Sequence, residues 1–186
     1  MDPVQAIEDE LLVLRAQGQD REALGELVGR WHGRLLRHAR LLTGDSAGAA
    51  DVTQEAWVGI VRGLRRLDDP ARFGPWAYRI VTRRAADWTA GRQRERRLVR
   101  AATELGRQSE AAPDSRADEI AQLRQALRAL PGDRRAMLAL LYLDGASVSL
   151  ISLIFQIPPG TVKSRLHHAR RELRQTIERM NNVEHR

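Results

Sequence analysis

The sequence predicts an all-α protein made of two small helical domains joined by a flexible linker. Apolar residues recur at three- and four-residue steps, which is the period of a helix face. Aromatic residues make up only 4% of the 186 residues, although strands favour aromatic and β-branched side chains. Residues 99–117 lack this periodicity and contain Gly, Ser, Pro and Asp, as linkers do. We therefore predict an N-terminal domain over residues 1–98, a linker over 99–117 and a C-terminal domain over 118–186.

The N-terminal half shows a series of helical segments. Leu11, Leu12 and Leu14 begin an apolar stripe after an acidic start. A longer stripe ends at the turn over residues 43–45 and consists of Leu24, Leu27, Trp31, Leu35, Ala39 and Leu42. The next run covers residues 49–67 and is broken by the Asp-Asp-Pro sequence at residues 68–70. Its expected inward positions are Val52, Ala56, Ile60, Val61 and Leu64. The last run extends from Trp76 to about Trp88 and continues into the arginine stretch Arg92–Arg97.

The C-terminal half ends in two helices joined by a short turn, which is a helix-turn-helix arrangement. Two helices precede them, one with an apolar face at Ile120, Leu123, Leu127 and Leu130 and one over residues 135–143. Ser147 is a typical N-cap for the next, short helix. After a turn at residues 156–160, the final helix spans Thr161 to about Met180, and its expected inward positions are Val162, Leu166, Ala169 and Leu173.

The net charge of +7 is concentrated in two segments. Residues 61–100 carry twelve arginines and four acidic residues, a net charge of +8, and residues 161–186 carry a net charge of +4. Two separated basic patches favour two contacts with a polyanion such as nucleic acid, although ordinary solvated faces remain an alternative. In the final helix the residues left to face outward are Thr161, Lys163, Ser164, Arg165, His168 and Arg171. A helix of this kind fits the major groove of DNA; the alternative is an ordinary amphipathic surface helix.

Several classes of protein are disfavoured by what the sequence lacks. It contains no cysteine, which excludes disulfides and thiolate chemistry. It has no glycine-rich phosphate loop and no histidine pair at metal-ligand spacing, so we expect no enzyme activity, no metal and no cofactor. The N-terminus lacks a signal pattern, and no apolar run approaches the ~20 residues of a membrane helix. We expect a cytoplasmic protein without membrane insertion, associated with the nucleoid when it acts.

Four blocks of sequence resemble the extracytoplasmic-function sigma factors, small members of the bacterial sigma-70 family. IPPGTVKSRLHHARRELR resembles the family's promoter-binding helix, and DREALGELVGRWHGRLLRHARLLTGD resembles the opening helix of its N-terminal domain. ADVTQEAWVGIVRGL resembles the helix that binds core polymerase, and FGPWAYRIVTRRAADW resembles the segment that melts and reads the −10 element. The blocks occur in the family's order and cover most of residues 20–175.

The resemblance implies a promoter-specificity subunit of RNA polymerase, with sites assigned by position. The positions that would contact the β′ clamp are Asp51, Gln54, Glu55 and Trp57, for which a solvated acidic face is the alternative. The positions that would bind the −10 element, including a flipped base, are Asp68, Asp69, Phe73, Trp76, Arg79, Arg83 and Arg84. Core packing is the alternative for Trp76. The outward residues of the final helix would bind the −35 element as duplex.

The short helix of the helix-turn-helix departs from the family pattern. Leu150 and Leu153 stand where the family has polar residues, and Gln156 stands where it usually has glycine. A helix that is apolar nearly all round is expected to be covered on more than one side. The candidates for this cover are an anti-sigma factor, the polymerase β flap and the N-terminal domain in a closed form. The alternative is a rearranged motif with weakened DNA contact.

Two functions compete with the sigma-factor interpretation. A stand-alone helix-turn-helix regulator would bind duplex DNA tightly without polymerase, and an adaptor would use the apolar helix to bind a partner. Neither function accounts for the DxxQE motif, which is Asp51, Gln54 and Glu55, together with the aromatic and arginine-rich segment that follows it. A sigma factor uses both. An enzyme is a more distant alternative.

Overall fold

The computed structural model describes residues 3–102 and 117–184, with side chains described over residues 4–94 and 122–180. Every regular element in these ranges is helical, which confirms the predicted fold class. The elements are α1 (Pro3–Gln17), α2 (Arg21–Thr43), α3 (Ser46–Gly63), η1 (Leu64–Arg66), η2 (Pro70–Arg72), α4 (Phe73–Ala102), α5 (Ala117–Ala129), α6 (Gly132–Tyr142), α7 (Val148–Phe155) and α8 (Pro159–Glu184). Most of the predicted linker, and the side chains of Ile120, Arg96 and Arg97, lie outside the described residues, so the domain boundaries stay predictions.

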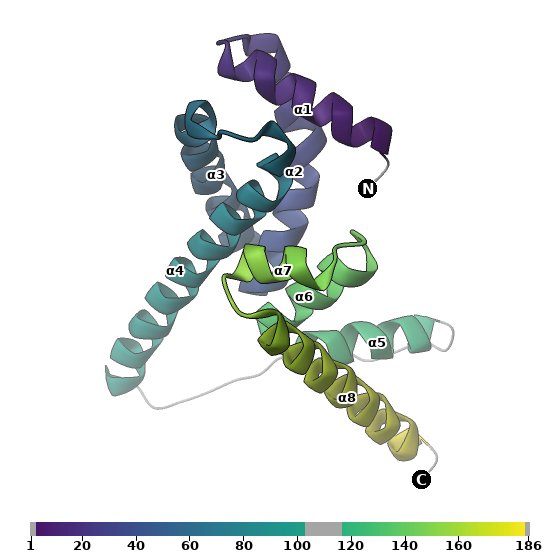
Figure 1. The fold of residues 1–186 in the computed structure, drawn as a ribbon. Helices are drawn as coiled ribbons and strands as arrows, with labels where there is room; N and C mark the ends of the chain where they lie inside the picture. The colour runs from purple at the N-terminus through teal and green to yellow at the C-terminus, as the bar shows by residue number, and fades with distance from the viewer. Residues whose placement is uncertain (1–2, 103–116, 185–186) are drawn as a thin grey trace.

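The N-terminal domain is built around α2, against which α1, α3 and α4 all pack (Figure 1). The predicted stripe of α2 is confirmed, because Leu27, Trp31 and Leu35 are buried. Asp20 caps the start of α2 by accepting hydrogen bonds from the backbone N–H groups of residues 22 and 23. Gly44 ends it in the left-handed conformation, with φ of 70°, a conformation that glycine adopts without steric cost.

α1 buries only one residue of the expected stripe, Leu12, and turns the other two toward solvent. Leu12 and Val13 are buried, whereas Leu11 and Leu14 are 57% and 54% exposed. The physical reason is the tight connection at residues 18–20, which reverses the chain and sets the face that α1 turns toward α2. Asp9 is buried at this contact, where it accepts a hydrogen bond from Trp31 Nε1 at 3.0 Å.

The C-terminal domain consists of α5, α6, α7 and α8, with α8 packed against the other three. Ser147 caps α7 by accepting a hydrogen bond from the backbone N–H of Leu150, as predicted. α8 begins at Pro159, two residues before the expected start. Its predicted inward face is confirmed, because Val162, Leu166 and Ala169 are buried and Leu173 packs partly against the core.

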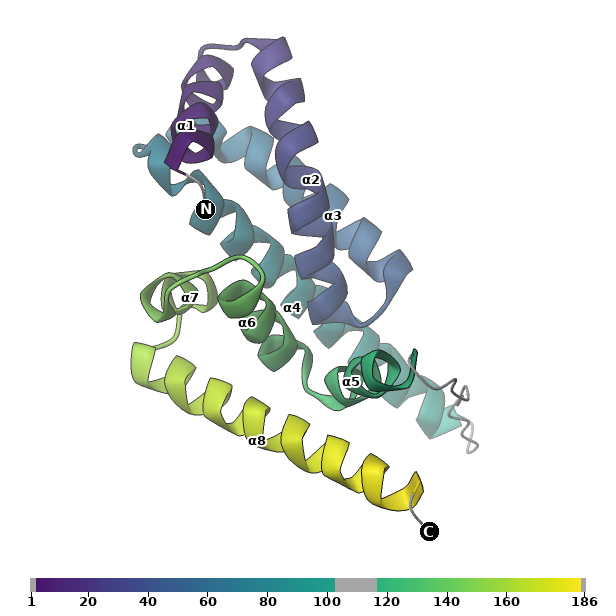
Figure 2. The same ribbon diagram turned by 90° about the vertical axis from the view of Figure 1, so that its right-hand side faces the viewer.

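The two domains are in direct contact. α6 packs on the C-terminal half of α2, and α7 lies across α4, as the two perpendicular views show (Figure 1 and Figure 2). The buried residues of both domains consequently form one continuous apolar cluster. Of the three candidates for covering α7, the N-terminal domain therefore occupies one side of it in this structure.

A buried histidine lies at this contact. His38 packs edge-on against Tyr78, with ring centroids 5.0 Å apart, and against Phe155 of α7, at 6.1 Å. Thr82 donates its hydroxyl proton to the carbonyl oxygen of Tyr78, so His38 Nε2, 2.9 Å from Thr82 Oγ1, must donate. Burial, with a smaller contribution from the Arg37 charge, lowers the pKa of His38 to about 3.

We expect the protein to lose stability below neutral pH because His38 must stay neutral in the fold. Its pKa is lower when folded than when unfolded, so the unfolded state binds more protons between pH 3 and pH 6.5. Lowering the pH from 7 to 5 is expected to remove about 2 kcal/mol through this group. Urea unfolding at both pH values measures the loss, and His38→Gln should lose less between them. An equal pH dependence in wild type and variant would contradict the assignment.

Candidate functional site

An apolar groove of about 710 Å³ lies between α2 and α3. Its lining consists of Val28, His32, Leu36, Ala50, Gln54, Trp57, Val58, Val61 and Arg62. The predicted polar residues of the DxxQE motif, Asp51, Gln54 and Glu55, are all exposed on α3 beside it. The helix thus brings together an apolar floor and an acidic, amide-bearing edge, a combination suited to a protein partner.

Two residues of this groove refine the interpretation of α3. Val61, which we expected to point inward, is 45% exposed and lines the groove with Val58. The indole N–H of Trp57 is buried and finds no acceptor within the described part of the chain. A buried donor without an acceptor is uncommon in folded proteins, so a partner that supplies a carbonyl or carboxylate here would satisfy it.

A second pocket, of about 350 Å³, lies where the connection between α3 and α4 meets the start of α4. Its lining consists of Arg66, Leu67, Asp68, Asp69, Arg72, Pro75, Trp76, Arg79 and Leu153. Asp69 shapes the loop by accepting a hydrogen bond from the backbone N–H of Ala71 and by pairing with Arg72 at 3.0 Å. The pocket therefore combines an aromatic wall with positive charge, as a site for an unpaired base requires.

The loop that forms one wall of this pocket is held from α1. The side-chain amide of Gln17 donates to the carbonyl oxygens of Leu64, at 3.0 Å, and Leu67, at 2.7 Å. These bonds span about fifty positions in the sequence, so sequence patterns gave no signal for them. Gln17 is thus a positioning residue for the wall that Leu67 contributes.

The two aromatic residues predicted for this region have different environments. Trp76 is half-buried: it packs against the core, as the alternative interpretation expected, and it also lines the pocket. Its contact with a base stays a prediction. Phe73 is only 1% exposed and packs against Trp31, with ring centroids 5.3 Å apart. Phe73 therefore lies beneath the pocket, and stacking on a base is available to Trp76 alone of the pair.

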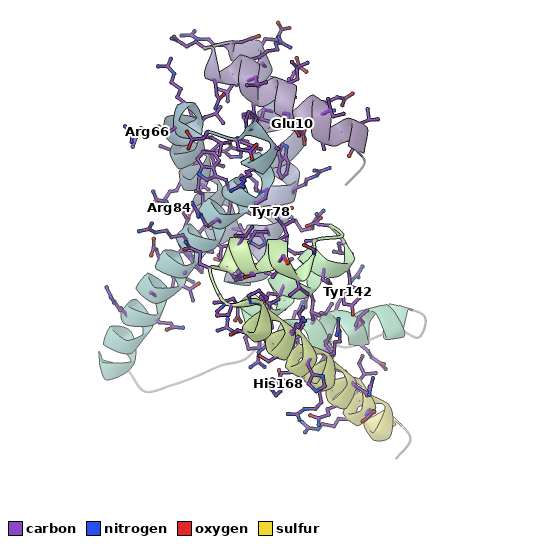
Figure 3. The ribbon with its side chains drawn as sticks, viewed as in Figure 1. Glu10, Arg66, Tyr78, Arg84, Tyr142 and His168 are labelled. Atoms are coloured by element: carbon purple, nitrogen blue, oxygen red, sulfur yellow. The ribbon has the colours of Figure 1, made fainter. Side chains whose placement is uncertain are left out.

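The predicted arginines of α4 form an exposed edge that leads away from the pocket. Arg79, Arg83 and Arg84 are all exposed, and Arg84 lies 3.8 Å from Glu55 across the gap to α3. Figure 3 shows Arg66 near the pocket loop and Arg84 farther along α4 on the same side of the molecule. The three guanidinium groups concentrate positive charge along this edge, which is suited to a polyanion.

The outward face of α8 is open to solvent while the two domains are in contact. Lys163, Ser164, His168 and Arg171 are exposed, and Thr161 is half-buried; Figure 3 shows His168 on the outer side of α8. Arg165 differs from the others because its guanidinium pairs with Asp133 of α6 at 2.9 Å. A phosphate contact by Arg165 would have to compete with that carboxylate.

α7 is covered on one side and free on another. Ile151 and Ile154 are buried, Leu150 is half-buried, and Leu153 is 64% exposed at the rim of the second pocket. The two predicted partner-binding residues are therefore in different situations, since Leu150 already faces the N-terminal domain. None of the described helices has the length and apolarity needed to cross a bilayer.

Comparisons with known proteins identify the family of the two helical regions. Residues 27–97 match the profile of Sigma-70 region 2, and residues 120–173 match that of Sigma-70, region 4. The chain is 29% identical to the RNA polymerase sigma-H factor of Pseudomonas aeruginosa, over 92% of this chain and 94% of that protein. It is 32% identical to the ECF RNA polymerase sigma factor SigL of Mycobacterium tuberculosis, over 78% of this chain and 84% of that protein. The solved structure of CnrH in complex with the cytosolic domain of CnrY has a TM-score of 0.66 at 22% identity, over 92% and 97% of the two chains, which supports the fold.

Proposed function

Because the chain belongs to the extracytoplasmic-function (ECF) sigma factors of the sigma-70 family, we propose that its three exposed surfaces bind polymerase, the −10 element and the −35 element respectively. A sigma factor directs RNA polymerase to promoters and is not itself an enzyme. The observation that carries the proposal is the separation of an apolar, acid-edged groove from an aromatic, arginine-edged pocket on one domain. Such a protein acts in the cytoplasm on the nucleoid.

The groove between α2 and α3 is proposed to bind the β′ clamp of core polymerase. Asp51, Gln54 and Glu55 supply exposed acceptors and an amide along its edge, while Trp57 supplies apolar area and an unsatisfied donor. Aromatic residues at the centre of an interface, surrounded by polar groups, are the usual arrangement of a strong protein–protein contact. The β flap is the further proposed core contact, made by the C-terminal domain.

The pocket beside Trp76 is proposed to take up one unpaired base of the −10 element. Its volume of about 350 Å³ is at the lower end of the range for small-ligand pockets, which suits a single base. Asp68 and Asp69 supply acceptors for base N–H groups on the loop, and Arg79, Arg83 and Arg84 would neutralise the phosphates that follow. Duplex melting is then favoured because the extracted base regains a stacking partner.

The exposed face of α8 is proposed to bind the −35 element in the major groove. Lys163, Ser164 and His168 lie within the first turns of the helix, where base edges and phosphates are reached. Thr161 and Arg171 flank them. An anti-sigma factor is a proposed partner for the exposed side of α7 at Leu153, with Leu150 becoming available once the domains separate.

Replacing Lys163 with alanine is expected to weaken −35 duplex binding by the holoenzyme and to reduce its salt dependence. One lost phosphate contact lowers the slope of log K against log salt by about 0.9. Lys163 is the cleaner test because Arg165 also pairs with Asp133, so its replacement would remove an ion pair between α8 and α6 as well. Binding isotherms at four salt concentrations measure the slope, and an unchanged slope would remove Lys163 from the interface.

The function as a whole is tested by reconstituted transcription. The purified protein is mixed with sigma-free core polymerase and fragmented genomic DNA of its own host, and the initiated transcripts are mapped. We expect discrete start sites that share a −10 and a −35 element. Core binding without initiation would contradict the DNA-binding assignments, and absence of core binding would favour the regulator or adaptor instead.

A further inference from the structure

Helix α1 exposes an apolar stripe that the proposed function does not use. Val4, Ile7, Leu11 and Leu14 are each more than half exposed. They are four of the ten large apolar side chains that are exposed among the described residues, although α1 is only 15 residues long. Apolar side chains gathered on one exposed helix face are typical of a surface that binds a partner.

The four residues follow the spacing of a coiled-coil seam. Steps of three, four and three residues place them at successive a, d, a and d positions of a heptad, with Val4 at the first a position. A face that packs into a globular core is usually wider than this. Strict a and d occupancy gives the narrow stripe by which one helix packs along another.

The opposite face of α1 is already occupied by its own domain. Leu12 and Val13 are buried where α1 packs on α2, and Asp9 accepts hydrogen bonds from Arg30 and Trp31 of α2. These three α1 residues hold positions b, c and f, which point away from the seam. α1 is therefore fixed as a helix before a partner arrives, whereas an isolated helix of this length is only marginally stable.

The charged residues beside the stripe favour a second copy of the chain in parallel orientation. Glu10 holds a g position and Arg15 the following e position, and in a parallel pair these positions of the two helices face each other. Glu10 of each copy would thus lie beside Arg15 of the other. In an antiparallel pair centred on the same seam, Glu8 would face Glu8 and Glu10 would face Glu10, and like charges oppose association.

The contacts that Arg15 makes within its own chain are compatible with this pairing. Its Nε and Nη2 atoms lie 2.8 and 2.7 Å from Asp20 Oδ2. A guanidinium carries five N–H donors, so the Nη1 group can meet a second carboxylate while the first contact persists. Arg15 is exposed, which leaves it accessible to Glu10 of another copy.

The position of α1 allows two copies to approach along the stripe. In both perpendicular views α1 lies at the end of the molecule far from α5 and α8 (Figure 1 and Figure 2). A seam of two heptads buries less than the roughly 1,600 Å² of a standard interface. The contact is therefore expected to be weak and to depend on protein concentration.

We propose that α1 is a self-association surface, through which two copies of the chain form a weak parallel dimer. The four residues of the stripe on one copy pack against the same four residues of the other about a two-fold axis. The seam includes none of the residues that line the α2–α3 groove or the Trp76 pocket. The inference is thus independent of the functions proposed for those two sites.

Sedimentation of the full chain over roughly a hundredfold range of concentration tests the dimer. We expect the average mass to rise from that of one chain toward that of two. Leu11→Glu should stay monomeric over the same range, because it places a carboxylate at the centre of the seam, opposite its own copy. Ile7→Glu is a second such variant. Gln5→Glu is the matched control, since it adds the same charge to an exposed b position of α1, and it should dimerise as wild type does.

The orientation is tested with single cysteines, because the chain itself contains none. In a parallel pair, position 14 of one copy lies opposite position 14 of the other. Oxidation of Leu14→Cys with copper–phenanthroline should therefore join two copies through a disulfide. Gln5→Cys, outside the seam, should remain a single chain under the same conditions.

Four outcomes would overturn the inference. A mass that stays at that of one chain at every concentration would show that no dimer forms. Equal loss of association in Leu11→Glu and Gln5→Glu would indicate a general charge effect. Association that persists in Leu11→Glu and is lost in Val58→Glu would place the contact in the α2–α3 groove. A disulfide formed only between Leu14→Cys and Val4→Cys copies would show an antiparallel pair.

Discussion

Replacing Asp51 and Gln54 with alanine is expected to abolish binding to core polymerase while the helical fold stays intact. Both side chains are exposed on α3, so their truncation to alanine leaves the packed core unchanged. A truncation that leaves a polar group of the partner buried and unpaired costs about 1.4 kcal/mol or more, so the two together should weaken binding at least about a hundredfold. Competition with a labelled sigma factor for core polymerase measures this loss.

The matched control replaces an exposed acid and an exposed glutamine on another helix of the same domain. Asp87→Ala with Gln93→Ala on α4 removes the same charge and the same amide. We expect this control to bind core polymerase as wild type does, with an unchanged unfolding midpoint. Equal loss in both pairs would indicate a general charge effect, and normal affinity of the α3 pair would refute the assignment of the clamp surface.

Helix periodicity predicted the elements whose apolar face is turned toward the core. The stripe of α2 and the inward face of α8 follow the expected positions because each face packs against one continuous core. Val61 was predicted to point inward on the same reasoning and is exposed. It belongs to a groove that the described part of the chain leaves uncovered, and periodicity alone does not distinguish a core face from a partner face.

Other features depend on contacts between residues that are distant in the sequence. The predicted stripe combined Leu11, Leu12 and Leu14, but only Leu12 of these is buried, together with Val13, because the packing of α1 against α2 selects the buried face. The pairing of Arg37 with Asp144 spans 107 positions. Neither residue has an unusual local pattern, so docking of the two domains required the structure.

The same distinction applies to the candidate sites. The resemblance assigned Asp51, Gln54 and Trp76 from motif positions; Gln54 and Trp76 each line a cavity, and Asp51 is exposed on the same helix as Gln54. It did not distinguish Phe73 from Trp76, since both are aromatic and three residues apart. Their difference in exposure comes from the packing of Phe73 against Trp31, an α2 residue.

Replacing Trp76 with alanine is expected to impair promoter opening more than any other single change in the −10 surface. Stacking of a base on an aromatic side chain is worth about 1–3 kcal/mol, so open-complex formation should fall roughly 5- to 150-fold. Binding to core polymerase and to the −35 duplex should persist, because neither surface includes Trp76. Single-round transcription from a promoter mapped in the reconstituted system measures the defect.

Two comparisons separate stacking on DNA from a structural role of the same side chain. Trp76 also packs against Gly63, where an added Cβ would lie 2.9 Å from the indole, so the alanine variant loses some packing too. Trp76→Phe keeps an aromatic ring and should retain most of the opening activity. A single-stranded −10 oligonucleotide should bind the holoenzyme of Trp76→Ala more weakly and that of Trp76→Phe nearly normally, because stacking on the ring contributes to binding whether or not the DNA begins as duplex. An equal defect in Trp76→Phe, or unchanged binding of the single-stranded oligonucleotide in Trp76→Ala, would show that the indole supports the fold and does not hold the base.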